Sequence, residues 1–296
     1  MKVYILFVIL ILTVNTYAQE DDDFIFDSNS EYDETAAIRY WYFCAASYCN
    51  PNVIVNWSCT TPCSKTPYMD DVQIFVNATN ENAGFSGYDP KHNEIIIVFR
   101  GTLPWSIKNW FEDLNYIKTS YPYCTNNCQV HRGFYYSYLG IQNQVLEAAK
   151  RLTNKYPNAK LVVTGHSLGG ALATHALVTL TVNGYRIDHY YSYGSPRVGD
   201  SAFFTFVKSI YPAAKFRVTH DHDPVPHLPM EAQGFHHINT EAYYKDFLIF
   251  HKDVKICNDE QKEDPRCSNQ NLVDLSVDDH CNYLGYNLAV GVLVCQ

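Results

Sequence analysis

Residues 161 to 177, "LVVTGHSLGGALATHAL", hold a single serine hydroxyl at the junction of two sequence patterns. Residues 161–164 begin with three apolar residues, as in a buried strand, and small helix-compatible residues follow the serine. The side chains that would block a sharp strand-to-helix turn are missing at Gly165, Gly169 and Gly170. Ser167 would therefore sit at the tip of the turn, where its oxygen can act as a nucleophile.

The same G-x-S-x-G pattern predicts a partner for a developing negative charge. The backbone N–H of Leu168 would point toward that charge from the start of a helix, where the helix dipole favours an anion. No Lys-Ser/Thr pair follows the glycines, which excludes a phosphate-binding loop. The alternative is a glycine-rich helix start that contains an incidental serine.

A serine becomes a nucleophile only when a base removes its proton and an acid orients that base. In a turn of this kind the acid and then the base follow the serine along the chain. The segment "KFRVTHDHDPVPHLP" (215–229) offers Asp221 and Asp223 at the end of a predicted strand. Its cluster of histidines and aspartates could instead form a metal site or a polar loop. The residues alone leave the base open among His227, His236, His237, His251 and His280.

The elements around these residues alternate between strand and helix. Strands are expected at 93–101, 159–165, 188–195 and 214–221. Helices are expected at 136–157, 168–182 and 200–212. Nearly continuous apolar strands joined by helices predict an α/β fold with a largely parallel sheet that is covered on both faces. Ligands bind such sheets beyond the carboxyl ends of the strands, where Ser167 is expected.

Several ordered motifs together resemble the class 3 lipase family, in particular the secreted fungal-type triacylglycerol lipases. The resemblance runs from about Tyr32 to Cys295. It is carried by "VFRGT" (98–102), "NWFEDL" (109–114), "VHRGF" (130–134), "VTGHSLGGALA" (163–173), "YGSPRVG" (193–199), "RVTHDHDPVPHLP" (217–229) and "DHCNYLG" (279–285). The family has the α/β-hydrolase fold, so the resemblance implies one domain of this type over residues 31–296.

The resemblance also implies roles for individual residues. Ser167 corresponds to the nucleophile, Asp223 to the acid and His280 to the base. Thr102 corresponds to the second oxyanion donor, beside Leu168. His237 matches a position that is not the base in the family, and Asp221 and His227 would form local hydrogen bonds. The chemistry would need no cofactor and no metal.

The segment "TLPWSIKNWFEDLNY" (102–116) has its apolar residues on one side of a short predicted helix. Ile107, Trp110 and Phe111 face one way, and charged residues face the other. Such a pattern is typical of a surface helix packed on a core. In the family this segment is the lid over the active site, so the resemblance implies a mobile lid over about 103–114 that includes Trp105.

An apolar lid favours water-insoluble substrates, because its rings can exchange burial over the pocket for burial in lipid. We therefore expect hydrolysis of acylglycerol esters at a lipid–water interface. One alternative is a carboxylesterase of the same fold that acts on soluble or plant-wall esters, such as a feruloyl esterase. Another is a catalytically silent lipid-binding relative, which should have lost a member of the triad.

The amino terminus predicts secretion. Residues 1–18 combine Lys2, a short apolar run and small residues at a cleavage position, as in a signal peptide. The apolar run is too short for an ordinary membrane span, although an uncleaved anchor is the alternative. Residues 19–30 are acidic and are expected to be flexible. The net charge of −9 argues against nucleic acid or an anionic membrane as the principal partner.

Ten cysteines fit an oxidising extracellular compartment. Close spacing favours the pairs Cys59/Cys63, Cys124/Cys128 and Cys257/Cys267, and zinc-finger spacing is absent. The family resemblance implies a bond between Cys49 and Cys295, which leaves Cys44 and Cys281 as the fifth pair. Asn56 and Asn77 lie in N-x-S/T sequons and are expected to carry glycans.

Overall fold

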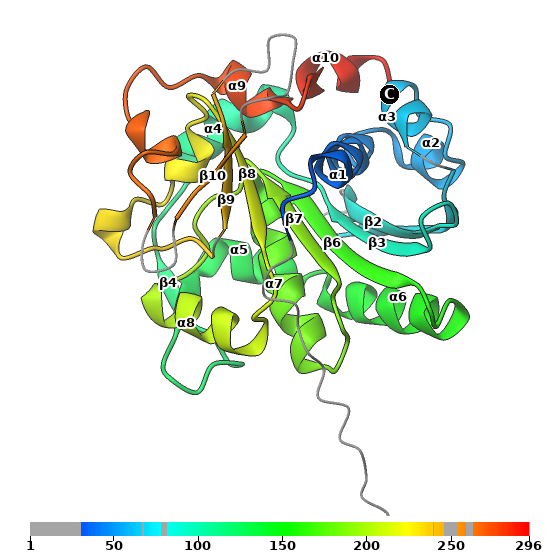
Figure 1. The fold of residues 1–296 in the computed structure, drawn as a ribbon, viewed down its shortest axis with the longest axis horizontal. Coiled ribbons are helices and arrows are strands. Elements are labelled where there is room, and N and C mark those ends of the chain that lie inside the picture. Colours follow the sequence, from blue (N-terminus) through cyan, green and yellow to red (C-terminus); the bar gives the residue numbers. More distant parts are fainter. Residues whose placement is uncertain are drawn as a thin grey trace, which may run out of the picture.

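The computed structural model describes residues 31–66, 68–77, 82–238, 240–245, 254–258 and 263–295. The expected signal peptide (1–18) and the acidic segment (19–30) lie outside these ranges, as does His251. Within them, the chain forms a central sheet with helices on both faces (Figure 1).

Eight strands form the central sheet. In spatial order they are β1 (Asp70–Val76), β2 (Asn82–Asp89), β3 (Glu94–Phe99), β6 (Lys160–His166), β7 (His189–Tyr193), β8 (Phe216–His220), β9 (Glu241–Tyr244) and β10 (Val254–Ile256). The strands from β3 to β9 run parallel to one another, and β1, β2 and β10 extend the two edges in antiparallel fashion. The four strands expected from sequence are β3, β6, β7 and β8, so the largely parallel arrangement is confirmed.

The helices and minor elements complete the fold. The helices are α1 (Glu34–Ala46), α2 (Pro51–Val55), α3 (Thr61–Lys65), α4 (Ile107–Asp113), α5 (Arg132–Leu139), α6 (Gln142–Lys155), α7 (Leu168–Val182), α8 (Ser201–Ile210), α9 (Val277–Cys281) and α10 (Leu288–Leu293). Two hairpins pair β4 (Lys118–Ser120) with β5 (Gln129–His131) and β11 (Asn282–Tyr283) with β12 (Tyr286–Asn287). Short 3-10 turns are η1 (Pro104–Ser106), η2 (Val225–His227), η3 (Glu231–Gln233) and η4 (Ser268–Gln270).

The central strands are apolar along their whole length because both faces of the sheet are covered. Ile95 and Ile97 of β3 belong to the core formed with α5, α6, α7 and α8. Ile96 and Val98, which alternate with them, belong to the core formed with α1 and α10. Alternating residues of one strand therefore enter two separate cores, which explains why the strand has no polar face.

One expected helix is divided in two. The periodicity over 136–157 predicts a single helix, but the chain turns between α5 and α6. Gly140 ends α5, and Ile141 has φ −125°, outside the helical range. Ile141 is buried in the core, so its burial at the turn outweighs the helical pattern of the sequence around it.

Four disulfides join Cys49 to Cys295, Cys59 to Cys63, Cys124 to Cys128 and Cys257 to Cys267. The expected fifth bond is wrong, because Cys44 and Cys281 are buried free thiols. Cys44 faces the sheet from α1, and its Sγ lies 3.3 Å from Thr164 Oγ1 on β6. Its side chain is thus used in packing α1 against the sheet.

No helix within the described ranges combines the length and the apolar content that a bilayer crossing requires. The buried α7 belongs to the core formed with α5, α6 and α8.

The free thiols give a first prediction. Without reductant, a thiol-alkylating reagent should label no cysteine in the native protein, because both free thiols are buried. In denaturant it should label Cys44 and Cys281 alone, as peptide mapping by mass spectrometry can determine. As the control, a sample that is both reduced and denatured should be labelled at every cysteine of the mature chain. Absence of labelling at these two positions in denaturant would mean that they are bonded.

Candidate active site

Ser167 occupies the sharp turn between β6 and α7. Its φ is 59° and its ψ is −130°, a positive-φ backbone conformation that residues other than glycine rarely adopt. Its backbone N–H donates to the carbonyl of Tyr193 at the end of β7, at 2.9 Å. The strained turn is thus held in place by the neighbouring strand.

Glycines permit this turn because three backbones meet there. A Cβ at Gly165 would lie 2.2 Å from the carbonyl oxygen of Gly169. A Cβ at Gly169 would lie 2.1 Å from the carbonyl oxygen of Phe99, at the end of β3. Neither position can accept any larger residue without moving backbone. The two glycines are therefore required because α7 lies in close contact with β3 and β6.

His280 and Asp223 form a buried pair beside this turn. His280, on α9, donates through Nδ1 to both carboxylate oxygens of Asp223, each at 2.9 Å. Asp223 also accepts hydrogen bonds from the Tyr283 hydroxyl and, at 2.8 Å, from the Val225 backbone N–H. Burial alone would raise the pKa of Asp223, but His280 and these hydrogen bonds outweigh it and lower the pKa below its usual value.

The structure brings the expected base next to the expected nucleophile. The ring of His280 stacks on the ring of His166, the residue before Ser167, with centroids 4.5 Å apart. Ser167 and His280 are both buried, and neither Ser167 Oγ nor His280 Nε2 has a hydrogen-bond partner among the described residues. The expected nucleophile and base thus have no competing hydrogen-bond partner among the described residues, and both are closed to solvent.

The other downstream histidines have different surroundings. His237 is buried and donates through Nε2 to the carbonyl of Pro226 at 2.8 Å. His227 contributes its backbone carbonyl to Arg197, whereas its ring nitrogens have no partner within the described ranges. His236 pairs through its backbone with Gly199. Among the histidines that the sequence left open, His280 alone contacts a buried aspartate in the described structure.

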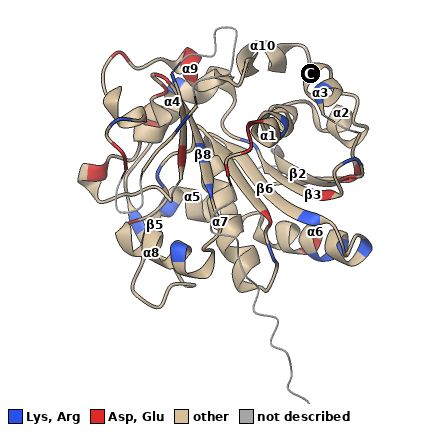
Figure 2. Cartoon of the chain, in the orientation of Figure 1, with Lys and Arg blue, Asp and Glu red and all other residues tan. Residues whose placement is uncertain are grey.

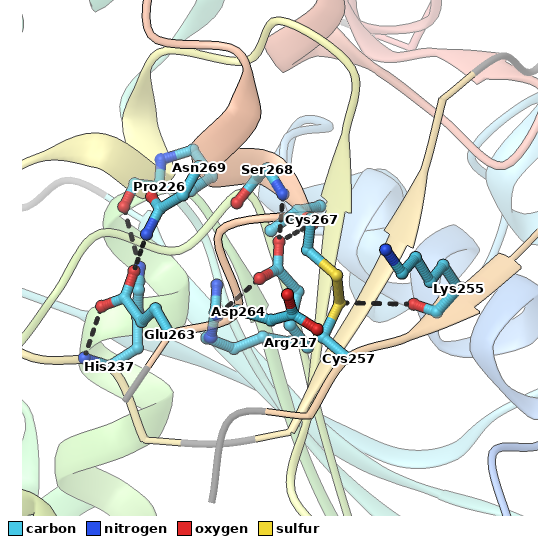
Figure 3. Close-up of polar contacts among 12 residues, drawn as sticks. Arg217, Pro226, His237, Lys255, Cys257, Glu263, Asp264, Cys267, Ser268 and Asn269 are labelled. Carbon is cyan, nitrogen blue, oxygen red and sulfur yellow. Dashed lines mark hydrogen bonds and ion pairs between the residues drawn. A yellow bond between two sulfur atoms is a disulfide. The ribbon is translucent and has the colours of Figure 1, made fainter. Parts of the chain in front are cut away.

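A buried ion pair fixes the loop that carries Asp223. Arg197 donates to Glu263 at 2.6 and 2.7 Å, and to the carbonyl oxygens of His227 and Pro229. Figure 3 shows Glu263 between His237 and Asn269, which both donate to it. Burial would raise the pKa of Glu263, but His237 and Arg197 lower it far below its usual value, so it stays charged.

Thr102 and Leu168 lie where oxyanion donors are expected. Phe99 pairs with Gly165 across β3 and β6, so the residues that follow Phe99 run alongside the Ser167 turn. The two residues share the wall of one cavity of about 320 Å³. Its lining comprises Asn77, Ala83, Arg100, Gly101, Thr102, Leu103, Ser106, Ser137, Leu168 and Leu172. A binding space thus adjoins the turn.

Tyr48 and His166, which the sequence did not single out, connect His280 to the segment 100–103 after β3, called the Gly101 loop here. The carbonyl oxygen of His280 can only accept, so the neutral His166 ring donates to it through Nε2, at 2.9 Å, and accepts at Nδ1 from the Tyr48 hydroxyl, at 2.7 Å. The Tyr48 oxygen in turn accepts from the Gly101 N–H, at 3.0 Å. Burial holds the pKa of His166 well below its usual value, so the ring stays neutral. This chain of hydrogen bonds positions both the Gly101 loop and the backbone of His280.

The expected lid is a 3-10 turn followed by the short helix α4. Ile107 is buried, and the Trp110 ring stacks on Phe134 of α5, with centroids 6.2 Å apart. Phe111 is half-buried beside Trp110, whereas Trp105 in η1 is 59% exposed. The apolar side of α4 thus packs inward, and one large ring of the segment remains in solvent.

The aspartate and histidine cluster behaves as a polar loop. Potential ligand atoms of Asp221, His222 and Asp279 lie within 4.8 Å of one another. His222 Nδ1 is 3.2 Å from Asp221, Asn271 donates to Asp221, and Asp279 accepts from the His222 backbone. These contacts account for all three side chains, and we assign no metal to them.

The two sequon asparagines lie in different environments. Asn56 ends α2 at an exposed position, and Asn77 is half-buried at the cavity that Thr102 lines.

Comparisons with known proteins agree with this geometry. The model of the family "Lipase (class 3)" matches residues 96–233. A secreted mono- and diacylglycerol lipase A from Penicillium cyclopium is 31% identical, over 73% of this chain and 71% of that protein. A solved Rhizomucor miehei triacylglyceride lipase superposes with a TM-score of 0.77 at 31% identity, covering 88% of this chain and 98% of that one.

A further solved structure, described as a triacylglycerol lipase with a serine protease triad, superposes with a TM-score of 0.76 at 30% identity. It covers 88% of this chain and 98% of that chain. The fold and the family match define a carboxylic ester hydrolase of the α/β class. The chain belongs to the class 3 lipase family.

The hydrogen bonds of Tyr48 give a second prediction. Tyr48→Phe leaves the Gly101 N–H and His166 Nδ1 unpaired, and a buried unpaired group costs about 1–3 kcal/mol. We expect kcat for a soluble short-chain ester to fall roughly tenfold to a hundredfold with little change in KM.

Tyr190→Phe is the matched control for this substitution. It removes a buried hydroxyl that bonds Thr174 at 2.9 Å and lies 3.5 Å from the Gly170 carbonyl, with no hydrogen bond to Gly101 or His166 in the described part of the chain. The control should lower thermal stability and spare kcat. If the Tyr48 variant behaves in the same way, Tyr48 supports the fold and does not position the reacting groups.

Proposed function

We propose that this chain is a secreted triacylglycerol lipase in which Ser167, His280 and Asp223 form the catalytic triad. The observation that carries the proposal is the buried His280–Asp223 pair next to the strained serine turn. Full burial of Ser167 is the second supporting feature. It matches an enzyme that admits its substrate only after a lid moves.

The proposed reaction follows from the positions of the polar atoms. Ser167 Oγ attacks the ester carbonyl carbon while His280 Nε2 takes its proton. Asp223 keeps the proton of His280 on Nδ1 and stabilises the charged ring. The backbone N–H of Leu168, together with Thr102, stabilises the oxyanion. His280 then protonates the departing alcohol, and water releases the acyl group by the same steps.

The lid determines the proposed substrate class. Ile107, Trp110 and Phe111 present an apolar surface that is now turned inward. Opening would expose these side chains, and a lipid surface would cover them again. This exchange favours insoluble acylglycerols over soluble esters. One similar lipase is described as acting on mono- and diacylglycerols and another on triacylglycerides, so the number of acyl chains needs direct measurement.

Secretion is supported by the chemistry of the chain. Four disulfides persist in oxidising compartments, and the leader-like residues 1–18 precede the described domain. Glycosylation at Asn56 and Asn77 belongs to the same proposal. At Asn77 a glycan would stand beside the cavity next to Ser167.

The triad yields a third prediction. Ser167→Ala and His280→Ala should each lower kcat on a soluble ester by at least a thousandfold, because nucleophile and base act as one unit. His237→Ala should lower thermal stability and keep most of the activity, since its ring bonds the Pro226 carbonyl. Initial rates and thermal unfolding of the three variants provide the measurement. Activity that survives in the His280 variant and is lost in the His237 variant would reverse the assignment.

A fourth prediction tests the substrate and the lid together. The rate on a short-chain triacylglycerol should rise steeply once its concentration passes the solubility limit, as droplets stabilise the open lid. Trp110→Ser should reduce this rise and spare hydrolysis of small soluble esters, because Trp110 supplies apolar surface that lipid would bury. Parallel rates on emulsified mono-, di- and triacylglycerols and on a feruloyl ester define the preferred substrate. Smooth saturation through the solubility limit would favour a soluble-ester esterase.

A further inference from the structure

The helix α10 exposes aliphatic side chains to solvent. Val290 is 65% exposed, Leu293 is 70% exposed, and Val294, which ends the helix, is 58% exposed. The opposite side of α10, with Leu288 and Val292, packs into the core beneath α1. A helix on the surface of a soluble protein normally carries polar residues on its outer side. The outer side of α10 is therefore apolar surface that no other described part of the chain covers.

This apolar side lies close to the active site. The strand β12 leads directly into α10, and its residue Asn287 pairs with Asn282, which follows α9 and its His280. Leu103, at the start of the expected lid, packs against the same core as the inner side of α10. Figure 1 shows α4, α9 and α10 at the same end of the molecule.

Further exposed apolar side chains lie at this end of the fold. The segment that leads into α9 exposes Leu272, Val273 and Leu275, by 62%, 71% and 46% respectively. Trp105 of the expected lid is also exposed. Exposed aliphatic side chains thus precede and follow the helix that carries His280.

The charge distribution restricts the partner. Residues 267–296 contain no lysine or arginine, and residues 280–296 contain no aspartate or glutamate either. In Figure 2, α10 has no charged residues and α9 has acidic residues. An anionic membrane would need basic residues here, and a protein partner would usually meet a polar rim. An uncharged lipid surface fits a patch of exposed aliphatic side chains with no cations.

The α10 patch is also held rigidly. The disulfide from Cys49 to Cys295 ties the end of α10 to the end of α1, and the Asn50 N–H donates to the Cys295 carbonyl at 3.1 Å. Asn287 caps the start of α10 through the Val290 N–H. A fixed patch needs no conformational change before it meets lipid, in contrast to a lid.

We propose that Val290, Leu293 and Val294 of α10 form a fixed docking surface for neutral lipid. The surface would hold the enzyme on an acylglycerol droplet before the lid opens and would orient the site toward it. This inference rests on the proposed function, because it takes the same acylglycerols as its ligand. In this proposal, adsorption to lipid and opening of the lid are two steps that depend on different residues.

The test measures partition onto emulsified triolein in the Ser167→Ala background, so that the droplets are not consumed. Val290→Ser with Leu293→Ser should weaken partition about a hundredfold, since each buried aliphatic side chain contributes about tenfold. Val182→Ser is the matched control. Val182 is 42% exposed at the far end of α7, the helix that begins at Ser167, and its replacement should change partition by less than about twofold.

Two further measurements keep the outcomes separate. The same substitutions in the active enzyme should leave kcat/KM for a soluble short-chain ester unchanged, which verifies that the fold and the site are intact. If the double variant fails to fold, Leu293→Asn alone should weaken partition about tenfold. Partition onto phosphatidylserine vesicles should be weaker than onto triolein.

Unchanged partition in a folded α10 variant, or an equal loss in the Val182 control, would overturn the docking surface. Stronger binding to phosphatidylserine than to triolein would overturn its assignment to neutral lipid. The proposed function fails by a different result, namely no ester hydrolysis by the unmodified enzyme. The partition measurement does not depend on that result.

Discussion

The close contact between the start of α7 and the ends of β3 and β6 is the constraint on which the rest of the site depends. Gly169 lies so near the Phe99 carbonyl that a single methyl group would collide with backbone. This contact holds the turn in which Ser167 has a positive φ. Because β3 continues into Gly101 and Thr102, the same contact brings the two expected oxyanion donors together. Strain at one residue is thus sustained by packing across three elements.

Buried charge and buried polarity hold the loops around that contact. The Asp223 carboxylate has lost its water and is compensated by His280, Tyr283 and a backbone N–H. Arg197 and Glu263 form a second buried pair behind it. Removal of either partner of such a pair leaves an uncompensated charge, so the loops between them are closely coupled. The hydrogen bonds of the uncharged Tyr48 and His166 add a third connection, between the Gly101 loop and α9.

The apolar side chains near the site lie in two kinds of place, and this difference determines how lipid could reach the site. The Trp110 ring of α4 packs inward on Phe134, whereas the aliphatic side chains of α10 face outward on a segment tied by a disulfide. The first arrangement suits a part that must move, because its burial can be exchanged for burial in lipid. The second suits a part that must not move. Adsorption and opening can therefore be separate steps with separate residues.

The sequence alone determined the α/β class, the main strands, the serine turn and the family, because hydrophobic period and local turn chemistry are properties of neighbouring residues. Four of the five expected cysteine pairs are present, and three of those join near neighbours. The residues alone left several histidines open and the family resemblance pointed to His280, but only the tertiary structure shows His280 in contact with Asp223. It also placed Cys44 against Thr164, divided the helix at Ile141 and brought Tyr48 to His166. Each of these depends on contacts between residues far apart in the chain, which no local pattern contains.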